Sequence, residues 1–179
     1  ERKFGKPDAP PQGSRVYTVV SPIEQQAAEK MTDEQWLKAI AKYGSADRLH
    51  RWEHPEKGGA WELAGQLREF VRNEPERFAS LSLTFPADTH PAYIEHTLDG
   101  LKGNGANNQL KIAVCRKAYA ESRQECGKAI ADLLGSIEEA LSDDAVNMLD
   151  WLATQHPDPE KELWNEEVTG GRPYYGGDI

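Results

Sequence analysis

Hydrophobic residues recur at helical spacing through most of the chain between residues 21 and 156, and no internal segment shows the alternation expected of a strand. The clearest apolar stripe consists of Leu63, Ala64, Leu67, Phe70 and Val71, with polar residues on the other side. Helices are expected over about residues 21–30, 32–43, 45–54, 60–74, 75–85, 89–102, 107–126, 130–141 and 142–156. The pattern predicts an all-α protein.

Capping residues set several of these expected boundaries. Ser21, followed by Pro22 and Glu24, predicts the first helix start as a capping box. Thr32 and Gln35 repeat that logic for the second helix. Further helix starts are expected at Asp88 or Thr89, at Asn107 or Asn108, and at Ser142.

Short helices joined by short turns are typical of stacked helix pairs. We therefore expect antiparallel helix pairs stacked as a short HEAT-like α-solenoid with about 40 residues per pair, in preference to a closed bundle. Three regions are expected: an extended lead-in (1–20), a helical-repeat domain (21–156) and an irregular C-terminal tail (157–179), the last cut off before further helices.

The acidic charge balance argues against two classes of ligand. The net charge of -9 repels nucleic acid and anionic membranes as main partners. Arg68, Arg72 and Arg77 form the nearest candidate phosphate site, but acidic residues interleave with them. A solvated face of mixed charge is the better interpretation.

One motif in the sequence indicates a specific reaction. His50, Glu53 and His54 match the H-x-x-E-H pattern of inverted zincins, in which two histidines bind Zn²⁺ and the glutamate polarises water. Pro55 follows directly and ends the helix that this motif requires. The site stays an alternative to a helix end carrying cationic groups near its negative pole.

Other polar residues lack the spacing of a metal or phosphate site. His90 and His96 fall on different faces of a helix, and His156 precedes a helix-ending proline. Asp143 and Asp144 suit the positive end of a helix dipole. A further aspartate, Asp150, is too far along the helix to share a metal ion with them. The run Lys102-Gly103-Asn104-Gly105 is interpreted as a turn and not as a phosphate-binding loop, because no strand leads into it. No catalytic, cofactor-binding or metal site is therefore predicted, apart from the zinc alternative.

The two cysteines are expected to be structural. If one helix carries both Cys115 and Cys126, the rise of ~1.5 Å per residue keeps them beyond disulfide distance. Small apolar thiols suit a reducing compartment. Because the sequence also has no signal peptide and no long apolar stretch, we expect a cytoplasmic location and no membrane partner.

The five tryptophans bear more on binding than on catalysis. Trp36 and Trp151 lie on or beside apolar stripes and are expected in the core. The other three are Trp52, Trp61 and Trp164, and an exposed tryptophan on stacked helices would anchor an interface.

Several stretches, taken together, resemble the helical-repeat region downstream of the nucleotide-binding module in large bacterial NTPases of the NACHT/STAND type. They are Ser21-Pro22-Ile23, Met31-Thr32-Asp33-Glu34-Gln35-Trp36-Leu37-Lys38-Ala39-Ile40, Gly58-Gly59-Ala60-Trp61-Glu62-Leu63-Ala64, Glu74-Pro75-Glu76-Arg77-Phe78-Ala79, His90-Pro91-Ala92-Tyr93-Ile94 and His156-Pro157-Asp158-Pro159. The resemblance implies a solenoid used for sensing or scaffolding, in which nucleotide chemistry lies elsewhere in the parent protein. It carries over no functional residue, because the phosphate-binding motif of the family is absent here.

We therefore expect a non-catalytic scaffold or sensor surface that contacts a protein partner or other domains of its own parent, with a role in defence or signalling. The competing hypothesis is a zinc-dependent hydrolase that uses His50, Glu53 and His54.

Overall fold

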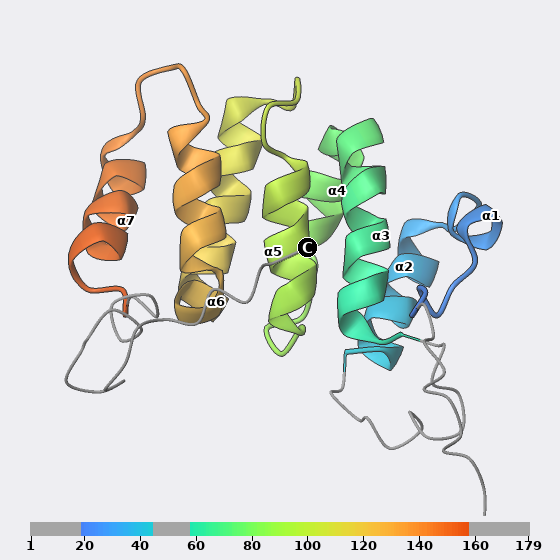
Figure 1. Cartoon of the computed structure of the whole chain (residues 1–179). Coiled ribbons are helices and arrows are strands. Elements are labelled where there is room, and N and C mark those ends of the chain that lie inside the picture. Colours follow the sequence, from blue (N-terminus) through green and yellow to red (C-terminus); the bar gives the residue numbers. More distant parts are fainter. Residues whose placement is uncertain (1–18, 45–57, 158–179) are drawn as a thin grey trace, which may run out of the picture.

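The protein was analysed as a computed structural model that describes residues 19–44 and 58–157. Within these ranges the chain forms α-helices and no β-sheet, as predicted (Figure 1). The helices are α1 (Gln25–Ala28), α2 (Asp33–Lys42), α3 (Ala60–Asn73), α4 (Pro75–Ser82), α5 (Pro91–Gly100), α6 (Asn108–Gly135) and α7 (Asp143–Thr154). None of these helices has both the length and the apolar character that crossing a membrane requires.

Helix α6 consists of two helices that meet at a sharp kink. Ser122 has a non-helical backbone, with φ -147° and ψ 34°. Figure 1 shows the chain reversing here, with the yellow N-terminal half (108–121) behind and the orange C-terminal half (123–135) in front. The sequence pattern predicted a boundary near Cys126, which was wrong by about one helical turn.

Helices α3 and α5 pack side by side and run parallel. Trp61, in the first turn of α3, contacts the ring of His90, the N-cap residue of α5. At the other end, the backbone of Gly100 approaches the side chain of Val71. The two N-terminal halves and the two C-terminal ends therefore lie together.

The C-terminal half of α6 continues this layer in the same direction. The thiol of Cys126 lies 3.7 Å from the carbonyl oxygen of Pro91, near the starts of both helices. Lys102, just after α5, donates to Asp132 at 3.2 Å near their ends. Figure 1 shows α3, α5 and this half of α6 next to one another.

Helices α2, α4, the N-terminal half of α6 and α7 form a second layer. Trp36 of α2 packs edge-on against Phe78 of α4, with ring centroids 5.8 Å apart. Helix α4 and the N-terminal half of α6 contact one another, and Tyr119 of that half packs on Trp151 of α7 at 5.5 Å. The chain passes repeatedly from one layer to the other.

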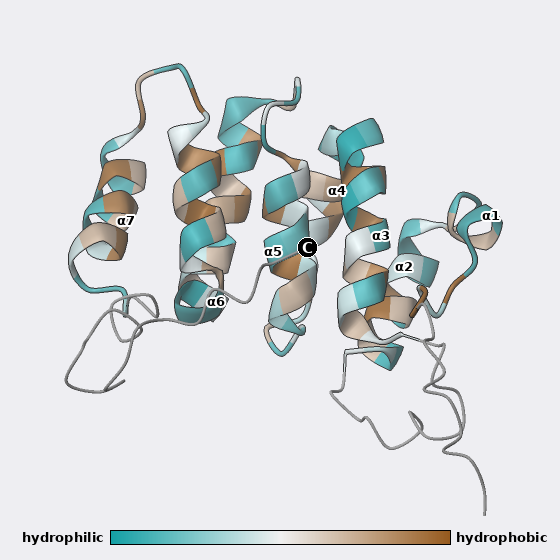
Figure 2. Cartoon of the chain, viewed as in Figure 1, coloured by the Kyte–Doolittle hydropathy of each residue, from teal (hydrophilic) through white to brown (hydrophobic). Residues whose placement is uncertain are grey.

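The core lies between the two layers and is continuous through the described residues. Every residue of the predicted stripe from Leu63 to Val71 is buried. Figure 2 shows hydrophobic and hydrophilic positions alternating along α3, α5, α6 and α7, as amphipathic helices require. The largest fully buried side chains are Trp36, Tyr93, Phe78, Ile40, Leu63, Leu67, Leu98, Leu101, Ile130, Leu133, Leu134 and Val71.

Of the five predicted helix starts, two were wrong and three were right, the third being Ser142, the N-cap residue of α7. Helix α1 spans one turn after Glu24, because the Ser21 hydroxyl donates to Gln66 Oε1 at 2.7 Å and does not cap a helix. At α5 the N-cap is His90, whose Nδ1 accepts the N–H of Ala92. The capping box of Thr32 and Gln35 and the cap at Asn107 are both confirmed.

Some predicted elements lie outside the described residues. These are the helix expected over 45–54, the tail from residue 158 and the lead-in as far as residue 18.

Candidate contact surface around Trp61

The residues of the zinc alternative lie in a part of the chain that the structure does not describe. His50, Glu53 and His54 belong to the range 45–57. Within residues 19–44 and 58–157, no group of three or more His, Cys, Asp or Glu side chains is arranged to hold a metal ion. The other predicted polar candidates can be located individually.

The three arginines of the candidate phosphate site each pair with carboxylates. Arg68 and Arg72 both contact Asp99 of α5, at 3.2 and 3.4 Å. Arg77 pairs with Asp33 of α2 at 2.8 Å. These contacts join neighbouring helices and leave the guanidinium groups already engaged, which favours the predicted face of mixed charge.

The aspartates and the glycine turn also have structural roles. Asp144, in the first turn of α7, pairs with Arg116 of α6, and this hydrogen bond holds the pKa of the carboxyl well below its usual range. Gly103 adopts a φ of 64°, a left-handed conformation that glycine accommodates without strain. Asn104 then closes the turn by donating its side-chain amide to the carbonyl of Gly100 at 2.8 Å.

Both cysteines are buried and form no disulfide. Burial raises the pKa of Cys115 and of Cys126 to about 12. Because the thiolate is the reactive form, these two groups are chemically quiet at neutral pH. The burial of both cysteines agrees with the structural role predicted for them.

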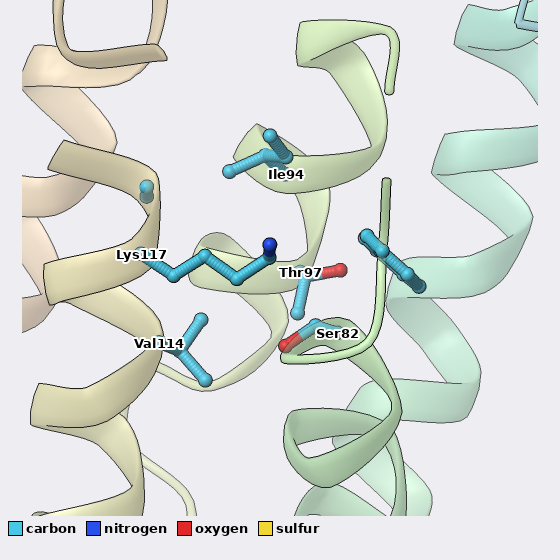
Figure 3. A pocket seen from close by; sticks show the side chains of 7 residues that line it. Ser82, Ile94, Thr97, Val114 and Lys117 are labelled. Atoms are coloured by element: carbon cyan, nitrogen blue, oxygen red, sulfur yellow. The ribbon is translucent and has the colours of Figure 1, made fainter. Parts of the chain in front are cut away.

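A small cavity lies between α4, α5 and α6 (Figure 3). Its volume of about 10 Å³ has room for about one water molecule. Lys117 extends toward Thr97 in Figure 3, but its ammonium donates to Glu121 at 2.7 Å. The hydroxyls of Ser82 and Thr97 donate to backbone carbonyls of their own helices. The cavity is therefore a packing defect with satisfied polar groups.

The most distinctive surface feature is an exposed tryptophan held between two histidines. Trp61 lies in the first turn of α3 with 56% of its surface exposed. Its indole makes edge contacts with His90 and His96, at centroid distances of 6.2 and 5.9 Å and interplanar angles of 80° and 79°. We call Trp61, His90, His96 and the neighbouring Glu95 the Trp61 surface.

Local structure explains how this surface is built. Glu62 accepts the N–H of Gly59 at 2.7 Å and so fixes the start of α3, where Trp61 lies. The Nδ1 of His90 is engaged by the first turn of α5, which orients its ring. Beneath them Tyr93 is fully buried and packs edge-on against His90 at 6.5 Å. The indole is thus supported by two rigid helices.

The electrostatics of the surface are set by groups on α3 and α5. Burial, with a further contribution from Arg68, lowers the pKa of His96 below its ordinary value. Glu95 and Asp99 act in the opposite direction. His96 is therefore neutral at pH 7. Tyr93 also has a perturbed pKa, raised well above its usual range by burial, and its hydroxyl has no hydrogen-bond partner among the described residues.

The other tryptophans show two different environments. Trp36 is fully buried, which confirms its predicted core position. Trp151 was also expected in the core, but it is only half-buried and lies beneath the guanidinium of Arg123 at 4.4 Å. His156 packs on it at 6.2 Å and contacts the carbonyl oxygen of Gln124 at 2.9 Å. Trp52 and Trp164 lie outside the described ranges.

The sequence contained a signal for the exposure of Trp61. Trp61 lies two positions before the buried Leu63, and two residues correspond to about 200° around a helix, so the two side chains point to opposite sides. What the sequence did not show is that two histidines from a different helix would reach the indole, because that contact depends on the pairing of α3 with α5.

Comparisons of the chain with family models, with curated proteins and with solved structures find no match. The interpretation of the Trp61 surface therefore depends on its own geometry.

Proposed function

We propose that this chain is a non-catalytic segment of HEAT-like helical repeats, a short α-solenoid, that offers a contact surface to a protein partner or to other domains of its parent. The observation that carries the proposal is the exposed indole of Trp61, which is held between His90 and His96 on two packed helices. Large, rigid aromatic side chains dominate binding energy at protein interfaces.

The packing of the helices supports a repeat architecture. Helix α3 begins at residue 60, α5 at residue 91 and the C-terminal half of α6 at residue 123, so that the intervals are 31 and 32 residues. Each of these helices is followed by one in the second layer. The intervals are shorter than the value of about 40 residues expected for HEAT pairs, so the pairs are compact ones.

The cavities of the protein and the polar side chains that line them support a binding role more than a catalytic one. Cavities that bind small molecules commonly measure about 300–1,000 Å³. The cavity between α4, α5 and α6 is about 10 Å³, and its polar side chains are engaged within the fold. A second hollow, of about 610 Å³, is open to solvent, and its one basic side chain, Arg77, is already paired with Asp33. An exposed aromatic side chain held by two packed helices suits contact with another polypeptide.

The sequence resemblance supports a wider context for this role. We propose that the segment belongs to the helical-repeat region of a cytoplasmic bacterial NTPase of the NACHT/STAND type, where it serves in sensing or scaffolding for signalling or phage defence. A Walker A motif encoded upstream in the same gene would support this context. Its absence from the full-length sequence would contradict it.

The contact role can be tested by photo-crosslinking in the organism that encodes the chain. Benzoylphenylalanine would replace Trp61 in one variant and Val146, which is 50% exposed on α7, in a matched control. We expect a discrete protein adduct from position 61 and none from position 146. Equal labelling at the two positions, or no adduct at position 61, would contradict the proposal.

A further inference from the structure

The three described tryptophans differ in what covers their rings. Trp36 packs against Phe70 and Phe78 in the core. Trp151 has the guanidinium of Arg123 over its ring at 4.4 Å. Trp61 is exposed, and no cationic group of the described residues lies over its indole. It is thus the one of these three whose ring is accessible to a cation from another molecule.

The indole is already held in place before any ligand arrives. The rings of His90 and His96 stand nearly perpendicular to it, at 80° and 79°. A side chain that is fixed in this way loses little conformational freedom on binding, which lowers the cost of association. The burial that lowers the pKa of His96 also keeps this imidazole uncharged at neutral pH, so it does not repel a cation.

The charges around the indole favour a cation. Glu95 acts electrostatically on His96 of this surface and on Cys126 of α6, so it lies between α5 and the C-terminal half of α6, and its carboxylate makes no ion pair with any described residue. Arg68, the basic group that acts on His96, already contacts Asp99 at 3.2 Å and Glu69 at 3.4 Å. The whole chain has a net charge of -9, which attracts basic partners over longer distances.

We propose that the Trp61 surface binds a lysine or arginine side chain presented by a basic segment of a partner protein, with the cation on the indole and Glu95 beside it. This inference rests on the proposed contact role and adds the chemistry of the partner. Stacking on an exposed indole increases affinity by about 2- to 5-fold for each cation. The partly exposed carboxylate of Glu95 adds a contribution of about the same size.

The inference can be tested with the full chain and two synthetic peptides. One is a blocked Gly/Ser peptide with three lysines, and the other carries norleucine in place of each lysine, so that chain length is kept and charge is removed. In ¹⁵N-labelled protein, the indole N–H signal of Trp61 is assigned by its loss in Trp61→Phe. We expect saturable shifts of this signal with the lysine peptide, and binding of the norleucine peptide to be at least about 2-fold weaker.

Two carboxylate variants test the electrostatic part. Glu95→Gln should weaken binding of the lysine peptide by about 1.5- to 5-fold and leave the norleucine peptide unaffected. Glu139→Gln, which makes the same charge change at an exposed position after α6, should have no effect.

Several results would overturn the inference. They are equal binding of the two peptides, equal effects of the two glutamate variants, and no shift at millimolar lysine peptide. If a protein adduct still forms at position 61 in any of these cases, the contact role stands and only the cationic partner is rejected.

Discussion

A Cβ atom built at Gly100, the last residue of α5, would lie 2.8 Å from the Cβ of Val71 on α3. It would also lie 3.0 Å from the backbone oxygen of Arg68. Val71 is fully buried, so neither neighbour can easily move away. The absence of a side chain at Gly100 therefore allows the two parallel helices to approach closely near their C-terminal ends.

Gly100→Ala should lower the free energy of unfolding by about 1–3 kcal/mol, because the new methyl overpacks the contact between α3 and α5. Gly65→Ala is a matched control in α3, where a Cβ would meet nothing within 4 Å. It should be neutral or stabilise by about 0.4–1 kcal/mol. Urea denaturation measures both variants, and equal stabilities would contradict the close packing of these helices.

The apolar stripe of α3 makes a second prediction. Leu67 is fully buried in the core, so Leu67→Ala should cost about 2–5 kcal/mol of unfolding free energy. Leu83 at the end of α4 is 36% exposed and is a control, because the same change there removes fewer buried contacts. Comparable losses of unfolding free energy at the two positions in chemical denaturation would mean that Leu67 is no more buried than Leu83, contrary to its place in the core.

Truncation of Trp36 to alanine should lower the stability of the protein far more than truncation of Trp61. Trp36 is fully buried between Phe70 and Phe78, and Trp36→Ala should cost about 3–5 kcal/mol. Trp61 is 56% exposed, so Trp61→Ala should change the free energy of unfolding by no more than about 1 kcal/mol while it weakens binding at this surface. A large loss of stability in Trp61→Ala would show that the residue serves mainly to hold α3 against α5.

The zinc alternative can be tested directly on the full chain. The protein, its His54→Ala variant and a His156→Ala control would each be equilibrated with Zn²⁺, desalted and analysed for metal by mass spectrometry. We expect all three to contain little zinc, because a proline directly after His54 disfavours the continuous helix that the motif needs. Stoichiometric zinc in the native chain and the control, lost only in His54→Ala, would establish the site and contradict a purely non-catalytic role.

The sequence predicted the helices better than the contacts between them. The stripe from Leu63 to Val71 and the caps at Thr32 and Asn107 were correct, because periodicity and capping are local properties of a segment. The break at Ser122 was predicted about one helical turn too late, near Cys126. No glycine or proline marks it, and apolar positions continue on both sides, so only tertiary packing of the two halves of α6 places the break there.

The same distinction applies to the Trp61 surface. The helical phase of Trp61 relative to Leu63 predicts that the indole is exposed. His90 and His96 were judged from their own spacing, which excluded a joint metal site on one helix face. Their shared contact with an indole 29 and 35 residues earlier in the chain follows from the parallel pairing of α3 with α5, which single-helix patterns cannot specify.

The lowered pKa of His96 makes stability depend on pH in a defined direction. Burial, aided by Arg68, disfavours the protonated imidazole in the folded chain, so that its pKa lies below the ordinary value of 6.5. The unfolded chain therefore binds more protons between these two pKa values, and stability falls as the pH drops through that window. NMR titration of the His96 ring should show the low pKa directly. Replacing the imidazole in His96→Gln should reduce the loss of stability on acidification between pH 7 and pH 5, whereas an unchanged pH profile together with an ordinary pKa would contradict the buried, neutral imidazole beside Trp61.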